Sequence, residues 1–160
     1  MDFKIRPLKL DDESDFYRLF DEYTKEYLIH ETLVPAHFDP KAGRLFFEDF
    51  KKNQNKIIAF VVETDGSLIG FCLGYIEVLD KWGRSYFDHD FANIYDAYVK
   101  SEFRKKGLGK QMVSLFEIEA KNRGLTQITI KDVDTKNFPS QSVCSKQGYS
   151  PWNLNYFKKI

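Results

Sequence analysis

Apolar spacing divides the first part of the chain into a short strand followed by a helix. Residues 3–9 place Phe3, Ile5 and Leu8 among polar neighbours, with Pro7 as an interruption, which is typical of a half-buried edge strand. The acidic stretch at 11–14 suits the positive end of a helix dipole and predicts a helix start. One apolar face is expected on that helix, made of Phe16, Leu19, Phe20, Tyr23 and Tyr27.

A loop and a second helix follow. Residues 28–38 have no clear period and predict a loop. Asp39 is a good N-cap residue, and Pro40 stands in the first turn, so a helix is expected from there to about Asn53. The apolar face expected for this helix is Leu45, Phe46 and Phe50.

The middle of the chain has strand character. Residues 56–63 form a nearly continuous β-branched and aromatic run, and residues 68–78 form a second one. The four residues between them contain an Asp-Gly pair, which predicts a hairpin turn. After a polar and aromatic segment at 79–91, residues 92–99 predict a third strand.

The last third alternates helix and strand. Residues 107–122 predict a helix that Gly124 ends, and residues 125–133 predict a strand. A helix from Asn137 to about 147 and a short aromatic strand at 152–157 complete the chain. The order β-α-α-β-β-β-α-β-α-β indicates an α+β fold with a β-α-β crossover over residues 92–133. We expect one domain spanning residues 1–160.

Composition and charge exclude several classes of protein. The chain has 24 Lys+Arg and 24 Asp+Glu, so no overall field attracts nucleic acid or an anionic membrane. It is 42% hydrophobic, which is too apolar for a disordered chain, yet it has no apolar run long enough to cross a bilayer. Two distant cysteines and three histidines without ligand spacing argue against a disulfide framework or a metal site. A reducing cytoplasm is the expected location.

The densest basic stretch, residues 102–112 (EFRKKGLGKQM), opens a predicted helix directly after a strand. A helix N-terminus binds anions readily, and glycines at 107 and 109 let a phosphate approach the main chain. A Walker A loop is excluded because Arg104 stands where its first glycine belongs and Gln111 follows Lys110. The dinucleotide fingerprint is excluded because only two glycines are present. The alternatives left are a pyrophosphate-binding turn and an ordinary basic loop.

The sequence resembles the GNAT superfamily of acetyl-CoA-dependent N-acetyltransferases. Residues 99–110 (VKSEFRKKGLGK) are similar to the family's strand, acidic turn and pyrophosphate loop. The helix that begins at Asn137 and ends at Gly148 and Tyr149 is similar to the family's closing motif. The resemblance implies a mixed, mostly antiparallel central sheet flanked by helices, and acetyl-CoA as the acyl-donor co-substrate.

The same resemblance implies roles for individual residues. The main chain at Tyr98 and Val99 would pair with the pantetheine arm, Asn137 would bind the same arm, and Lys146 would reach the nucleotide phosphate. For the lysines, a solvated surface is the alternative interpretation. Arg104 would shape or contact the pyrophosphate loop. The cradle itself would be formed by the amides of Lys105, Lys106, Gly107, Leu108, Gly109 and Lys110.

Two catalytic candidates follow. Cys144 stands where the family very often has a tyrosine that protonates the departing thiolate, and its alternative role is that of a small packing residue. Asp96, on the strand that leads into the turn, is the candidate base for the amine, with an ion-paired surface carboxylate as the alternative.

The expected function is acetyl transfer from acetyl-CoA to a primary amine of a small molecule or a protein. The alternative is a non-catalytic acyl-CoA-binding sensor or partner domain. Residues 28–38 and 79–91 are expected to border the acceptor site, with aromatic walls. A C-terminal edge strand is compatible with a homodimer. The acceptor walls are expected to include Tyr27, Phe38, Trp82, Tyr86 and Phe87.

Overall fold

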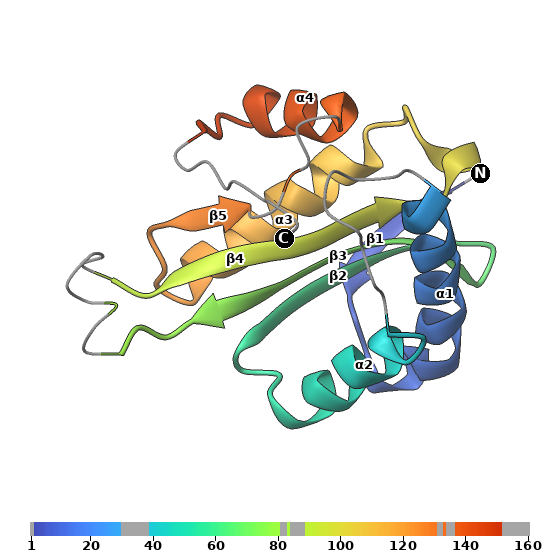
Figure 1. Ribbon diagram of the computed structural model, residues 1–160, viewed down its shortest axis with the longest axis horizontal. Coiled ribbons are helices and arrows are strands. Elements are labelled where there is room, and N and C mark those ends of the chain that lie inside the picture. Colours follow the sequence, from blue (N-terminus) through green and yellow to red (C-terminus); the bar gives the residue numbers. More distant parts are fainter. Residues whose placement is uncertain are drawn as a thin grey trace, which may run out of the picture.

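A central sheet with helices on both faces organises the molecule (Figure 1). The computed structural model describes residues 2–29, 39–80, 83, 89–130, 133 and 137–151. The expected strand at 152–157 lies outside these residues. The elements are β1 (Lys4–Pro7), α1 (Glu13–Ile29), α2 (Ala42–Lys52), β2 (Ile57–Thr64), β3 (Ser67–Glu77), β4 (Phe91–Val99), α3 (Leu108–Asn122), β5 (Ile128–Ile130) and α4 (Phe138–Lys146), with short 3-10 turns at Leu10–Asp12 and Ser101–Phe103.

The five strands lie in the order in which they occur in the chain, β1-β2-β3-β4-β5. Among the described strands, the first four are antiparallel neighbours, and β5 pairs in parallel with β4. That parallel pair and the intervening α3 form the expected β-α-β crossover, so the α+β class is confirmed. Asp65 and Gly66 both have positive φ angles, as a type I′ hairpin turn requires.

Each face of the sheet has its own apolar core. One core joins α1 and α2 to the face that contains Leu73, and it is rich in aromatic rings packed around Phe71. The other joins α3 to the opposite face, which contains Cys72 and Ile94. Figure 1 shows α3 and α4 on one side of the sheet and α1 and α2 on the other. Strand β4 therefore contributes side chains to two separate environments.

The structure differs in three details from the elements expected from the sequence. Helix α1 extends to Ile29, where a loop was expected from residue 28. In α2 the buried residues are Gly43, Phe47 and Phe50, whereas Leu45 is 57% exposed, so the expected apolar face was wrong by part of a turn. Strand β5 has three residues, fewer than the expected span at 125–133. Among the described residues, no helix is both long enough and apolar enough to cross a membrane.

Candidate functional site

The outer edge of β4 is open over half of its length. Strand β5 pairs with it only at Ala92, Asn93 and Ile94. From Tyr95 to Val99 this edge has no strand partner in the part of the chain that the structure describes. Unpaired main-chain groups on a strand edge accept an extended chain as an added strand. This edge is therefore a fitting place for a pantetheine arm.

The register of β3 and β4 determines which main-chain groups point outward. The amide of Lys100 donates to the carbonyl of Ile69, which lies directly opposite, at 2.9 Å. Because bonded pairs alternate along an antiparallel ladder, the main chain of Tyr98 points toward β3, whereas Ala97 and Val99 point to the open edge. By strand parity, the main chain of Ala97 is better placed than that of Tyr98 for the expected pairing with a pantetheine arm, and that pairing stays a prediction.

A β-bulge at Tyr95 changes which faces the side chains of β4 occupy. Ile94 lies opposite Gly74 and Asp96 lies opposite Leu73, so Tyr95 is the extra residue. Before the bulge, Ile94 packs in the core beneath α3. After it, Asp96 lies on the α1 face, where its carboxylate accepts a hydrogen bond from the hydroxyl of Tyr23 on α1. In a regular strand without a bulge, residues two apart share a face, so Asp96 would then lie on the α3 face with Ile94.

The turn between β4 and α3 has the backbone of an anion site. Lys105 and Gly107 have positive φ angles of 63° and 78°, and Gly107 is the N-cap residue of α3. The first amides of a helix have no partner within the helix and point outward from its N-terminus. A Cβ atom added to Gly109 would meet no other atom within 4 Å, so the space beside this residue is open. The turn fits a pyrophosphate.

Arg104 shapes this turn from within. Its Nε donates to the carbonyl of Val99 at 2.7 Å, and its Nη2 lies 2.5 Å from a carboxylate oxygen of Glu26 on α1. The guanidinium also lies over the ring of Tyr98, 5.6 Å from its centre. These contacts support a role for Arg104 in shaping the loop.

The lysines of the cradle differ in their surroundings. The ammonium of Lys106 lies over the rings of Phe3 and Phe103, 4.9 and 5.4 Å from their centres, which orients it toward β1. Lys105, Lys110 and Lys146 are exposed on the surface, as both interpretations of these residues expected. Leu108 is buried beneath the turn and anchors α3 to the sheet.

Helix α4 lies against α3 and carries two of the expected residues. Asn137 is its N-cap, and its Oδ1 accepts a hydrogen bond from the amide of Ser140 at 3.1 Å. Cys144 is half-buried, and burial raises the pKa of its thiol, so the sulfur keeps its proton at neutral pH. Tyr149, just after this helix, donates its hydroxyl proton to Glu117 on α3 at 2.9 Å.

Asp96 is the carboxylate whose surroundings are most unusual. Removal from water raises its pKa, and the hydrogen bond from Tyr23 opposes that shift. Two other carboxylates of this region bond to nearby groups: Glu77 accepts from the hydroxyl of Tyr95, and Asp90 accepts from the amide of Leu79. Asp96 therefore combines partial burial with a position beside the open edge at Ala97.

The family is now decided by a direct match. A family model described as the acetyltransferase (GNAT) family matches residues 16–149, which includes the open edge, the turn and most of the elements described above. The chain belongs to the GNAT family. The expected enzyme class, an acetyl-CoA-dependent N-acetyltransferase, is thereby confirmed. No curated protein matches the chain at a significant level.

Solved structures share the fold of this GNAT chain. The aminoglycoside N-acetyltransferase AAC(6')-Iy, in complex with a bisubstrate analogue, aligns with a TM-score of 0.75 at 19% identity, covering 100% of this chain and 99% of the other. Glucosamine-6-phosphate N-acetyltransferase from Arabidopsis thaliana gives a TM-score of 0.70 at 22% identity, with 100% and 99% covered. Ribosomal-protein-alanine N-acetyltransferase from Brucella melitensis biovar Abortus 2308 gives 0.71 at 16%, with the same coverage.

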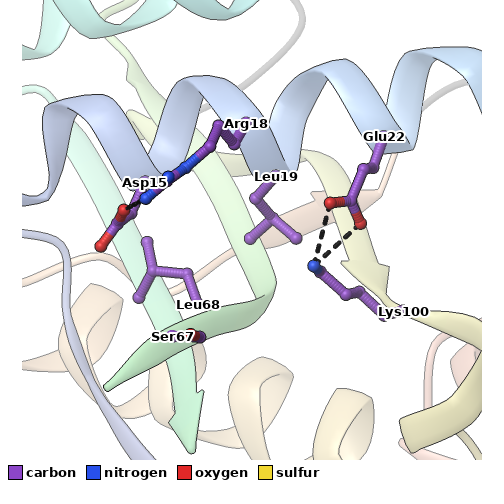
Figure 2. A pocket seen from close by; sticks show the side chains of 7 residues that line it. All are labelled: Asp15, Arg18, Leu19, Glu22, Ser67, Leu68 and Lys100. Carbon is purple, nitrogen blue, oxygen red and sulfur yellow. Dashed lines mark hydrogen bonds and ion pairs between the residues drawn. The ribbon is translucent and has the colours of Figure 1, made fainter. Parts of the chain in front are cut away.

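A separate pocket of about 170 Å³ lies between α1 and the start of β3, and Figure 2 shows its side chains. Arg18 pairs with Asp15, and the ammonium of Lys100 lies 2.9 Å from the carboxylate of Glu22. These charges neutralise one another within the pocket. The pair between Lys100 and Glu22 joins α1 to the end of β4, whereas Arg18 and Asp15 both lie on α1.

Several expected acceptor walls fall outside the described residues, namely Phe38, Trp82, Tyr86 and Phe87. Tyr27 is described, and its ring packs edge-on against that of Tyr23, 5.9 Å between centres. Two further residues were not singled out from the sequence. Ala97 stands two positions before Val99, so in a regular strand the main-chain groups of both residues point the same way. Asn93 is a polar residue within a buried strand.

Proposed function

We propose that this GNAT protein transfers an acetyl group from acetyl-CoA to a primary amine of a small molecule by direct attack. The observation that carries the proposal is the position of Asp96. A carboxylate with a raised pKa lies on the α1 face of β4, next to the residue whose main chain faces the open edge. A base is thus available beside the place where the acyl group would lie.

The donor side is built from main-chain groups. The amides at the N-terminus of α3 would hold the pyrophosphate, and Ala97 and Val99 would pair with the pantetheine arm. The acyl donor supplies a thioester carbonyl, which an amine attacks. An outward-facing amide of β4 at Ala97 or Val99 would donate to the carbonyl oxygen as charge develops there. Asn137 and the surface lysines at 105, 110 and 146 are proposed to add contacts along the donor.

Proton movement is assigned to two side chains. Asp96 accepts the proton that the amine loses as its nitrogen forms the new bond to the acyl carbon. The carbon–sulfur bond breaks, and the departing thiolate takes a proton from the Cys144 thiol or from water. The raised pKa of Asp96 makes it a stronger base than an ordinary aspartate, and the raised pKa of Cys144 keeps its proton available.

A small cationic acceptor is supported by the α1 face of β3 and β4. Glu77 and Asp96 are both acidic there, and Tyr75 and Tyr95 add aromatic surface, with 5.4 Å between their ring centres. Carboxylates attract an ammonium group, and rings stabilise it further. Two of the structural neighbours are named for aminoglycosides or glucosamine-6-phosphate, whereas a third is named for a protein amine.

The second candidate, a non-catalytic acyl-CoA-binding domain, is favoured by one observation: Cys144 stands where the family very often has tyrosine. The two candidate functions can be distinguished by measuring the release of free thiol from acetyl-CoA in the presence of a broad panel of amines. We expect thiol release that depends on the acceptor. Cofactor binding without any such release would favour the sensor and overturn the enzyme proposal.

A further inference from the structure

A buried amide in the middle of β4 has an unused hydrogen-bonding group. Asn93 is 0% exposed, and its Oδ1 accepts a hydrogen bond from the hydroxyl of Thr129 on β5 at 2.9 Å. Its Nδ2 has no hydrogen-bond partner within the described part of the chain. A buried N–H group without a partner destabilises a fold, so such groups are rare and call for an explanation.

The position of Asn93 relates this group to the proposed reaction. Asn93 lies opposite Tyr75, and Asp96 lies opposite Leu73. Residues directly opposite each other on antiparallel strands share a face, so Asn93 and Asp96 both belong to the face covered by α1 and α2. The bulge at Tyr95 brings Asp96 onto the face that Asn93 occupies. Within the described residues, pairing with β5 ends between them, after Ile94.

We propose that the Nδ2 group of Asn93 donates a hydrogen bond to an oxygen of the acceptor, which makes Asn93 a specificity-determining residue. The inference rests on the proposed function and names the chemical class of the acceptor. The oxygen belongs to the acceptor because Asn93 shares a face with the base. The donor's pantetheine arm instead follows the outward edge of the strand, at Ala97 and Val99.

The local charges indicate that this oxygen is uncharged. Asp96 and Glu77 lie on the same face, so an acceptor carboxylate would be repelled there, whereas a hydroxyl or a carbonyl would not. The hydrogen bond from Thr129 to Oδ1 orients the Asn93 amide with its NH₂ group turned away from Thr129, which fixes the direction of donation. The acceptor class is therefore an amine with a neutral oxygen on a nearby carbon, such as an amino alcohol or an amino sugar.

The test compares two acceptors of equal size, ethanolamine and propylamine. In the wild type, kcat/KM should favour ethanolamine. In Asn93→Leu that preference should fall by at least about tenfold, because the apolar side chain cannot donate to the hydroxyl. Affinity for acetyl-CoA should be unchanged. An unchanged preference, or an equal loss for both amines, would overturn the proposal.

Two further variants make the result decisive. Thr129→Val, which no longer orients the amide, should reduce the preference in the same direction and provides the test if Asn93→Leu does not fold. Thr64→Val alters the other buried atom without a partner, on the distant hairpin, and should leave the preference intact. Loss of the preference in Thr64→Val as well would contradict a specific role for Asn93.

Binding measurements separate this inference from the proposed function. Calorimetric titration of both amines in the presence of CoA requires no turnover. A preference for ethanolamine that Asn93→Leu abolishes would support the site even if no acetyl transfer occurred. Equal binding of both amines to the wild type would overturn the site, even if both were acetylated.

Discussion

Two neighbouring features determine the position and the pKa of the Asp96 carboxylate, namely the bulge at Tyr95 and the hydroxyl of Tyr23. The bulge places the carboxylate on the α1 face, and the hydroxyl stabilises its charged form against the cost of burial. Burial prevails, so the pKa lies above that of an ordinary aspartate. A carboxylate that is costly to ionise is a better proton acceptor, which connects this residue's surroundings to the proposed chemistry.

Replacing Asp96 with Asn should therefore reduce kcat/KM by roughly 10²–10⁴-fold, the usual contribution of a general base. In the wild type, kcat/KM should rise with pH through the raised pKa of Asp96, above the range of an ordinary aspartate. That rise should disappear in Asp96→Asn. A pH profile measured on both proteins checks this. An unchanged acidic limb in the variant would assign the base to another group.

Asp96→Asn should reduce activity, but at neutral pH it should increase the free energy of unfolding relative to the wild type. The folded protein holds the proton of Asp96 to a higher pH than the unfolded chain does. The free energy of unfolding therefore falls as pH rises through the folded pKa. At neutral pH, Asp96→Asn lacks this penalty, and Tyr23 can still donate to the amide oxygen. Urea unfolding at neutral and acidic pH should show the variant gaining relative stability at the higher pH. A uniform loss of stability would contradict the assigned burial effect.

Cys144 offers a second test at this scale. Its thiol is half-buried and protonated at neutral pH, so it can either donate a proton or only fill space. We expect Cys144→Ala to retain its affinity for acetyl-CoA, because the sulfur is not part of the pyrophosphate turn. Steady-state kinetics with a good acceptor then decide between the two roles. A large fall in kcat at constant affinity identifies the acid, and near-normal kcat identifies a packing residue.

At the scale of elements, the end of α1 is fastened to the donor side of the site. Glu26 pairs with Arg104 of the turn, and one turn of helix earlier Glu22 pairs with Lys100 at the end of β4. Arg104 also bonds the carbonyl of Val99, so a shift of α1 would reach the strand edge and the turn together. The α1 face and the donor turn are thus mechanically connected.

Glu26→Gln should weaken acetyl-CoA binding by about two- to fivefold, which corresponds to the ~0.5–1 kcal/mol that a partly exposed ion pair contributes. Calorimetric titration at low and high salt measures the effect, which should shrink as salt screens the pair. Glu22→Gln is the matched control, because it removes a neighbouring ion pair that does not involve Arg104. Equal losses in both variants would contradict a specific role for the link between Glu26 and Arg104.

Sequence patterns predicted most elements because each had a strong local signal. The Asp-Gly pair defined the hairpin, and the basic turn before α3 was visible from its glycines. The face of α2 was assigned wrongly because four apolar residues of that helix, Leu45, Phe46, Phe47 and Phe50, fit more than one helical phase. Only contact with α1 and the sheet decides that Phe47 is buried and Leu45 exposed.

At the scale of the whole molecule, β4 separates the two halves of the proposed reaction. Its outer edge and the turn before α3 would hold the donor, while its α1 face carries Asp96 and Asn93. The turn could be predicted because its residues are consecutive. The outward direction of the Ala97 main chain and the shared face of Asn93 and Asp96 could not, since strand parity and the bulge arise from pairing with β3, and local sequence does not reveal either.

Calorimetric titration with acetyl-CoA, beside ATP and NAD, tests the central claim most directly, with wild type and Gly109→Val in parallel. The wild type should bind acetyl-CoA alone, in the micromolar range. Gly109→Val should fold normally, because its side chain enters open space, yet should bind acetyl-CoA far more weakly. Unchanged affinity in the variant, or no binding by the wild type, would contradict the assignment of this turn as the donor site.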